Sequence, residues 1–245
     1  MRPIICTIGP FNVYSYGLML AAAFLLSVTL AQAQAKKEKI DPAAIFDLAF
    51  LSFICGVLGA RIFYIAENIG YYLRWPLEII MLQRGGLSWF GGLILGAACG
   101  IAYLKKKGLP FYLALDLISP FVALAQSIGR IGCLLNGCCF GRPSLRGIYF
   151  NVHEASLIPT QLYSSLALLL IFAVLRLLQD KPHRRGEIFF CYLLFYSLKR
   201  FLIEFWRADN PAVIYGLSLF QLLSLALFLF SLVKLSMLRN EKLLK

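Results

Sequence analysis

Charged residues and histidine are scarce in this sequence. Asp, Glu, Lys and Arg together make up 15% of the 245 residues, and only two residues are histidine. Apolar residues make up 60% of the chain, whereas soluble domains contain about half. This composition excludes an ordinary water-soluble domain and indicates a polytopic membrane protein.

A metal centre is poorly supported by the sequence. The chain has seven cysteines but no Cys-x-x-Cys pair, and its two histidines, His153 and His183, are predicted to lie on opposite sides of the membrane. Cys133, Cys138 and Cys139 crowd a glycine-rich segment, and disulfide pairing among them stays open. We therefore expect no metal site and no cofactor.

Apolar windows long enough to cross a membrane recur along the chain. A helix needs roughly 20 apolar residues to span a hydrocarbon core of about 30 Å. Seven such windows can be placed, at about 11–31, 43–66, 88–104, 111–131, 160–178, 187–207 and 215–237. We predict an all-α integral membrane protein with about seven transmembrane helices, built as one domain over residues 1–245.

The distribution of lysine predicts the orientation of these helices. Lysines follow the first, third, fifth and seventh windows, at Lys36, Lys37, Lys39, Lys105, Lys106, Lys107, Lys181, Lys242 and Lys245. Because cytoplasmic segments are rich in Lys and Arg, the N-terminus is predicted outside and the C-terminus inside. A cleavable signal peptide, ending near the Ala-Gln-Ala sequence after residue 30, is the alternative, but the lysines that follow would resist export.

The two longest connections then lie on the outer side. Residues 67–87 contain Tyr71, Tyr72 and Trp75, aromatic side chains that suit the level of the lipid headgroups. We expect this connection to form an arm that lies partly in the interface, and residues 138–159 to cap a cavity.

The outer segments contain arginine but no lysine. These arginines are Arg2, Arg74, Arg84, Arg142 and Arg146. The planar guanidinium group suits phosphate better than an ammonium group does. With a net charge of +12, this pattern favours an anionic lipid headgroup over nucleic acid as the partner.

Arg130 is the first candidate for the functional site. It stands where the fourth window runs into a glycine-rich turn, and an arginine at membrane depth is costly unless it faces water, a partner or an anionic ligand. The alternative is an arginine whose stem lies in the apolar layer while its charged end reaches the interface.

The sixth window carries a second group of charges. Arg200, Glu204 and Arg207 have the spacing i, i+4 and i+7, which places them on one helical face. A structural salt bridge between Arg200 and Glu204 is one explanation, but two cations share this face with one acid. An anionic ligand would balance the excess. Asp116 lies roughly 20 Å deeper than Arg130, at 1.5 Å per residue, and is expected to make a structural contact between helices.

Other windows bring polar or glycine-rich residues to the same outer level. Tyr16 belongs to the first window, Gly91 and Gly92 to the third, and Gln161 and Tyr163 to the fifth. The tyrosines can equally be ordinary aromatic residues of the headgroup belt. Together these residues predict a cavity for a molecule with an anionic head and apolar tails.

The sequence resembles the prolipoprotein diacylglyceryl transferase family over most of its length. The matching motifs, in order, are Tyr16-Gly17-Leu18-Met19, Gly91-Gly92-Leu93, Gly129-Arg130-Ile131-Gly132 with Asn136-Gly137 and Gly141, Pro159-Thr160-Gln161-Leu162-Tyr163, and Arg200-Phe201 with Glu204-Phe205 and Arg207. Each motif is weak alone, but their order within a seven-span frame makes the resemblance specific.

The resemblance implies an enzyme of the bacterial cytoplasmic membrane that moves the diacylglyceryl group of phosphatidylglycerol to the lipobox cysteine of a prolipoprotein. By position, it implies that Arg130 and Arg200 hold the lipid phosphate and that Glu204 orients the arginines. It also implies that the remaining matched residues line or shape the pocket: Tyr16, Gly91, Gly92, Asn136, Gly141, Gln161, Tyr163 and Arg207.

Several positions depart from the family pattern. Phe90 stands where the family typically has a histidine, a candidate base, and Ile158 stands where another histidine is common. Cys133, Cys138 and Ser164 replace asparagine, glutamate and glutamate. The chain thus has fewer side chains that could accept or donate a proton in the reaction. Two alternatives to the implied function stay open. One is a related lipid-headgroup transferase with another acceptor, and the other is a phospholipid-binding membrane protein without catalysis.

Overall fold

The computed structural model describes residues 3–8, 11–81, 85–208 and 210–240. The chain divides into two compact units, which we describe separately. One contains residues 1–31 and 115–245, and the other contains residues 32–114. The described residues are mostly helical, as the composition predicts.

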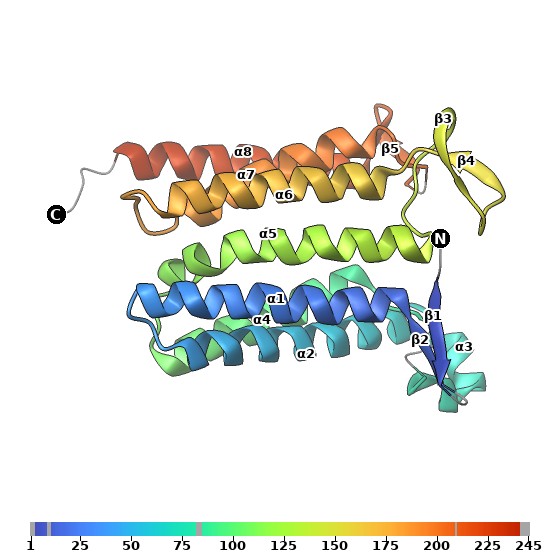
Figure 1. The fold of residues 1–245 in the computed structure, drawn as a ribbon, viewed down its shortest axis with the longest axis horizontal. Helices are drawn as coiled ribbons and strands as arrows, with labels where there is room; N and C mark the ends of the chain where they lie inside the picture. The colour runs from blue at the N-terminus through green and yellow to red at the C-terminus, as the bar shows by residue number, and fades with distance from the viewer. Residues whose placement is uncertain (1–2, 9–10, 82–84, 209, 241–245) are drawn as a thin grey trace. The chain divides into compact units, whose positions relative to one another are not determined.

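The larger unit contains most of the elements (Figure 1). Its helices are α1 (Ser15–Lys37) and α5 (Phe111–Asn136), each of which continues into the other unit, then α6 (Thr160–Gln179), α7 (Glu187–Glu204) and α8 (Leu219–Asn240). Three antiparallel hairpins pair β1 (Ile4–Ile8) with β2 (Phe11–Tyr14), β3 (Pro143–Phe150) with β4 (Ala155–Leu157), and β5 (Ala212–Ile214) with β6 (Leu217–Ser218).

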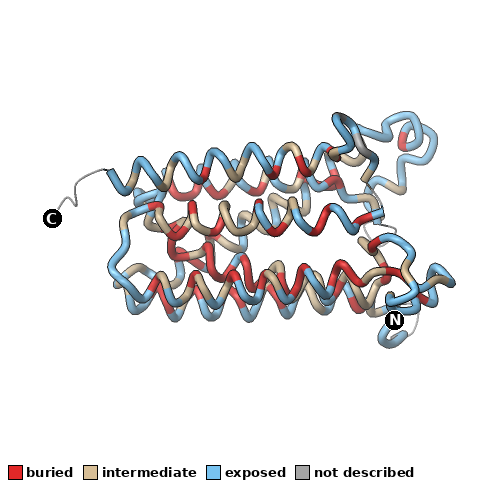
Figure 2. Tube along the Cα trace, turned by 90° about the horizontal axis from the view of Figure 1, so that it is seen from above, coloured by how far each residue is buried: buried red, intermediate tan, exposed pale blue. Residues whose placement is uncertain are grey.

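Apolar and small polar contacts hold α5, α6 and α7 together. Leu168, Leu175 and Ile188 are almost completely buried in one cluster. Ser127 and Ser165 exchange hydrogen bonds between α5 and α6, the kind of short polar contact that joins membrane helices. Along the helices, buried positions alternate with intermediate and exposed ones (Figure 2). Many of the exposed residues are large and apolar, which suits contact with lipid.

Asp116 makes the structural contact predicted for it. Its carboxylate, on α5, accepts hydrogen bonds from the backbone N–H groups of Gly186 and Phe189 at the start of α7. These N–H groups have no partner within their own helix, and a negative charge at a helix N-terminus is favourable. Asp116 therefore joins α5 to α7 at the end opposite Glu204.

The smaller unit contains α2 (Pro42–Glu67), α3 (Ile69–Arg74), the short 3₁₀ helix η1 (Pro76–Ile79) and α4 (Trp89–Lys107). Glycines bring α2 and α4 into close contact, as their number in α4 predicts. A Cβ atom at Gly59 would lie 2.5 Å from the carbonyl oxygen of Gly91, and one at Gly92 would lie 3.2 Å from that of Gly56. Side chains at these positions would force the helices apart.

Within the described part of the chain, five helices are long and apolar enough to cross a membrane: α1, α2, α5, α6 and α8. The chain is therefore a multi-pass membrane protein. Among the described residues, α4 and α7 also reach 18 residues, but α4 ends in three lysines and α7 carries four charged side chains. The number of spans thus stays a prediction at seven.

Several predicted boundaries were wrong. The first helix begins at Ser15 rather than residue 11 because residues 11–14 pair with β1. Helix α5 continues to Asn136, so Arg130 lies within the helix and not at its junction with the turn. Helix α7 ends at Glu204, so Arg207 lies beyond it.

The two long connections are ordered in the described residues. The predicted arm contains α3 and η1, and the predicted cap contains the β3–β4 hairpin. Their depth in the membrane stays a prediction.

Candidate active site

The end of α7 holds an acid surrounded by donors. Glu204 is 5% exposed, and its Oε2 atom lies 3.1 Å from Nη2 of Arg200 and 3.8 Å from Nε of Arg207. Its Oε1 atom accepts hydrogen bonds from Asn210 and from Ser218. Oε1 is thus hydrogen-bonded, whereas Oε2 makes ion pairs without a hydrogen bond, and the carboxylate is suited to positioning the arginines.

Backbone contacts place Arg207 although it lies outside the helix. Gly141 forms an antiparallel bridge with Arg207, and the N–H of Arg142 donates to the carbonyl oxygen of Trp206 over 2.8 Å. A Cβ atom at Gly141 would lie 2.6 Å from that same carbonyl oxygen, so only glycine allows this approach. The glycine-rich turn after α5 is thereby joined to the end of α7.

Arg130 lies near these residues but differs from them in its contacts. It is close enough to interact electrostatically with Lys199 and Arg200, and also with Tyr16 on α1. Among the described residues, no hydrogen bond or ion pair engages the Arg130 guanidinium. Its N–H donors are thus free for a ligand, whereas those of a structural arginine would be used.

A buried lysine adds to the positive charge of the site. Lys199, next to Arg200 on α7, is 7% exposed, and its Nζ atom lies 4.5 Å from the ring centroid of Tyr196. The region thus gathers three arginines and one lysine, and in the described part of the chain Glu204 is the one carboxylate that pairs with them. This excess of cations can bind an anion in a poorly hydrated place.

The start of α6 supports the turn that carries the cysteines. Thr160 donates a hydrogen bond to the carbonyl oxygen of Cys139 over 2.8 Å, and Gln161 donates to that of Cys138 over 2.7 Å. Gln161 is 1% exposed, and among the described residues its Oε1 atom has no hydrogen-bond partner. This buried oxygen can accept a hydrogen bond from a substrate hydroxyl group.

Three thiols meet beside the arginines. The sulfur atoms of Cys133, Cys138 and Cys139 all lie within 4.8 Å of one another, and Asn136 lies beside Cys138. Hydrogen bonds from the thiols of Cys133 and Cys138 lower the pKa of Cys139, and the nearby charges of Arg130 and Arg207 lower it further. The sequence shows these cysteines close together along the chain, but their spacing does not predict that the three sulfur atoms meet.

The structure brings most predicted site residues into this one unit. They are Tyr16, Arg130, Asn136, Gly141, Gln161, Arg200, Glu204 and Arg207. Gly91 and Gly92 belong to the smaller unit, where they pack against α2. Tyr163 is 46% exposed, so a place in the site stays a prediction. Sequence reasoning missed Asn210 and Ser218, whose roles depend on the chain turning back after α7.

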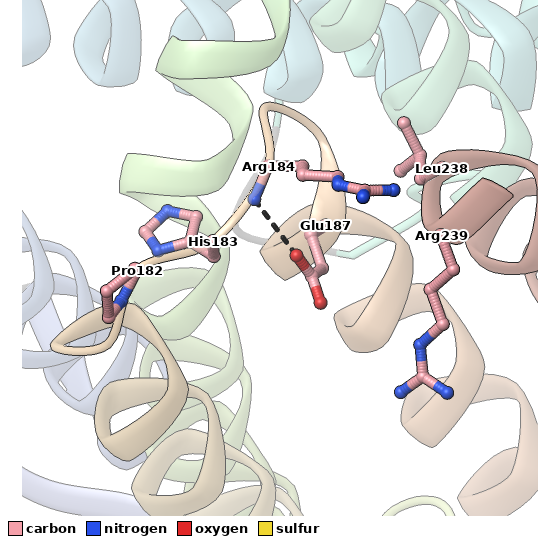
Figure 3. Close-up of a pocket in the computed structure, with 6 residues that line it drawn as sticks. All are labelled: Pro182, His183, Arg184, Glu187, Leu238 and Arg239. Carbon is pink, nitrogen blue, oxygen red and sulfur yellow. Dashed lines mark hydrogen bonds between the residues drawn. The ribbon is translucent and has the colours of Figure 1, made fainter. Parts of the chain in front are cut away.

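A cavity of about 280 Å³ lies at the opposite end of α7 (Figure 3). It is lined by Pro182, His183, Arg184, Glu187, Leu238 and Arg239. Here the backbone N–H of Arg184 donates to Glu187 over 2.9 Å. Glu187 and Glu204 are the first and last residues of α7. This cavity is therefore separate from Arg130, Lys199, Arg200 and Arg207, which we call the arginine group.

Comparison with known proteins shows the family to which the chain belongs. A sequence model described as prolipoprotein diacylglyceryl transferase matches residues 3–237. The chain belongs to the prolipoprotein diacylglyceryl transferase family. The match includes every residue of the arginine group and the cysteine turn.

Relatives within the family are similar over nearly their whole length. The phosphatidylglycerol–prolipoprotein diacylglyceryl transferase of Staphylococcus xylosus is 36% identical over 94% of this chain and 87% of its own. That of Clostridium tetani is 35% identical, over 92% and 93%. That of Streptococcus pyogenes is 34% identical, over 99% and 97%. The resemblance predicted from the motifs is confirmed.

Proposed function

We propose that this chain transfers the diacylglyceryl group of phosphatidylglycerol to the lipobox cysteine thiol of a prolipoprotein. In this reaction the thiol loses its proton to solvent, and its sulfur forms a bond to a glycerol carbon while the bond from that carbon to a phosphate oxygen breaks. The electron pair leaves with glycerol phosphate. The observation that carries the proposal is that Arg130 and the buried Lys199 add positive charge beside the Arg200–Glu204 ion pair, while among the described residues no hydrogen bond or ion pair engages the Arg130 guanidinium.

Arg130 and Arg200 are assigned to the lipid phosphate. Arg130 has free donors in the described structure, and Arg200 keeps donors beyond the one directed at Glu204. Negative charge on the phosphate grows as the bond to carbon breaks, so fixed guanidinium groups stabilise the transition state more than the bound lipid. Glu204 is assigned to position Arg200 and Arg207.

The remaining residues of this unit are assigned to the pocket. Gln161 offers its buried Oε1 atom to a hydroxyl group of the lipid head. Gly141 allows the close backbone contact that fixes Arg207, and Asn136 ends α5 at the start of the cysteine turn. Tyr16, near Arg130, would form the side of the pocket contributed by α1.

We also assign all seven long helices to the membrane, with the N-terminus outside and the C-terminus in the cytoplasm of a bacterium. The lysines at the ends of α1 and α4 support this orientation. It places the arginine group at the outer side, where the signal peptides of prolipoproteins and the outer leaflet lipids are reached. Gly91 and Gly92 would then begin α4 at that same side.

The test of function replaces the proposed phosphate ligands. Arg130→Ala and Arg200→Ala should each lower phosphatidylglycerol-dependent transfer to a lipobox peptide, and each should fail to support a transferase-depleted cell. Charge-assisted hydrogen bonds contribute about 1.5–3 kcal/mol each, so a loss of roughly 10- to 150-fold per variant is expected. Binding of phosphatidylglycerol should weaken as well.

Arg184→Ala is the matched control because Arg184 lies in the separate cavity at the other end of α7. It should keep normal transfer. Undiminished transfer by both Arg130→Ala and Arg200→Ala would reject the assignment. Transfer of the lipid group to an acceptor other than the lipobox thiol would replace the proposed reaction with that of a related transferase.

The orientation has its own test. A cysteine introduced by Lys106→Cys should react with a membrane-impermeant maleimide only after the cells are opened. A cysteine introduced by Leu145→Cys, at a fully exposed position of β3, should react in intact cells. Labelling of both in intact cells would overturn the orientation, since it would place the end of α4 outside.

A further inference from the structure

The three thiols at the end of α5 form a group that the proposed reaction has not yet used. Cys133 belongs to the last turn of α5, and Cys138 and Cys139 follow it in the turn. Their sulfur atoms lie within 4.8 Å of one another. Three thiolates around a zinc ion at about 2.3 Å lie roughly 3.8 Å apart, so the sulfur atoms would have to approach one another by at most about 1 Å to bind a metal.

The backbone around these cysteines is already fixed. The N–H of Cys138 donates to the carbonyl oxygen of Cys133 over 3.1 Å, and the carbonyl groups of Cys138 and Cys139 accept hydrogen bonds from Gln161 and Thr160. Cys139 has a φ of 62°, a left-handed backbone conformation that residues other than glycine rarely adopt. Such support is what a metal site requires of the residues around its ligands.

The charges near the group suit a metal held by three thiolates. Three thiolates and one Zn²⁺ carry a net charge of −1, and Arg130 and Arg207 act on Cys139 electrostatically. Cations would repel a bare divalent ion but stabilise this anionic complex. The same arginines keep the thiolates close to the place assigned to the lipid phosphate.

We propose that Cys133, Cys138 and Cys139 bind one zinc ion as thiolates and leave its fourth position open for the acceptor thiol. This inference rests on the proposed function for the identity of the acceptor. Zinc sites with three protein ligands and an open position are the catalytic type, and a thiol that binds the metal is deprotonated. The zinc thus prepares the nucleophile in a site where Glu204 is already paired with Arg200.

The step balances without any change in oxidation state. The acceptor thiol gives its proton to solvent as it binds zinc. Its sulfur then attacks the glycerol carbon, the carbon–sulfur bond forms, and the bond from carbon to the phosphate oxygen breaks. The electron pair leaves on glycerol phosphate, whose charge faces Arg130 and Arg200.

The first experiment measures metal binding without activity. The full chain, reduced and stripped of metal in detergent micelles, is titrated with Co²⁺ as a spectroscopic probe and then with Zn²⁺. One equivalent of Co²⁺ should give thiolate charge-transfer absorption that Zn²⁺ removes. Cys133→Ser and Cys139→Ser should lower this binding at least tenfold. Cys191→Ser, which removes a half-buried cysteine of α7 outside the group, should keep it.

Two results would overturn the zinc site. One is equal Co²⁺ binding by Cys139→Ser and the unchanged chain. The other is a disulfide among the three cysteines in the protein isolated without reductant, found by mass spectrometry of its peptides. Because folding can suffer in the variants, phosphatidylglycerol binding is measured on each, and a variant that binds the lipid normally but not the metal supports the site.

The second experiment tests the open position. A lipobox peptide with cysteine should change the Co²⁺ spectrum, and the same peptide with serine should not. No change with either peptide would overturn the role of the metal in holding the acceptor. Normal transfer by the metal-free chain would also overturn it while leaving the proposed function intact. Metal binding without transfer of any kind would instead reject the proposed function.

Discussion

Arginines in the two units show opposite uses of the same side chain. Arg61, on α2 in the smaller unit, is 6% exposed and directs its N–H groups at backbone carbonyls of residues 78–86. The guanidinium also lies 5.3 Å from the ring centroid of Tyr72. In the larger unit, Arg130 has no such partner among the described residues, and Arg200 pairs with Glu204.

The two sites differ in which groups accept hydrogen bonds from the guanidinium N–H donors. Arg61 holds the end of η1 and the following connection against α2, so its donors are used by the protein itself and leave little for a ligand. Near α7, in contrast, Arg130 has no hydrogen bond or ion pair among the described residues, and Arg200 and Arg207 both pair with Glu204. A buried arginine therefore indicates a ligand site only when the surrounding chain leaves its donors or its charge unsatisfied.

Among the variants that distinguish a structural arginine from a ligand-binding one, Arg61→Met should have the largest effect. This change leaves several backbone carbonyls without a donor, at about 1–3 kcal/mol for each buried unsatisfied group. We expect a clear loss of thermal stability and rapid proteolysis between residues 68 and 88, measured on the purified chain. Arg130→Ala should show neither effect. Equal stability of Arg61→Met and the unchanged chain would erase the contrast.

A smaller effect is expected at the contact between α2 and α4. Gly59→Ala and Gly91→Ala place methyl groups on the two sides of the same close approach, and overpacking of this kind costs about 1–3 kcal/mol. If Gly91 serves packing alone, the two variants should lose stability and transfer alike. A further loss of transfer in Gly91→Ala, at equal stability, would support its predicted place in the substrate pocket.

The smallest effect should come from Arg200→Lys. This change keeps the positive charge but loses the planar fork that can contact Glu204 and a phosphate oxygen together. We expect transfer between that of Arg200→Ala and the unchanged chain, with most of the loss in the rate of the chemical step. Full activity of Arg200→Lys would show that charge alone is needed, and would weaken the assigned geometry.

The extent of sequence prediction differs between parts of the site. Arg130, Arg200 and Glu204 could be predicted because charges are conspicuous in apolar helices, where burial without a partner is costly. Arg61 is equally buried but was not recognised, since its partners are backbone carbonyls, which every residue type carries. Arg207 was predicted on a face of this helix but lies after the helix ends, where a bridge to Gly141 holds it and it still pairs with Glu204.

The sequence by itself determined that this is a membrane protein of a known family, since hydropathy and the order of motifs depend only on the residues along the chain. The sequence also identified the charged residues in apolar helices, where burial without a partner is costly. Only the tertiary structure decided that the sulfur atoms of Cys133, Cys138 and Cys139 meet, and that Asn210 and Ser218 satisfy Glu204. These contacts depend on turns that reverse the chain after α5 and α7. Sequence spacing does not fix such reversals, because hydrogen bonds between distant backbone segments set their direction.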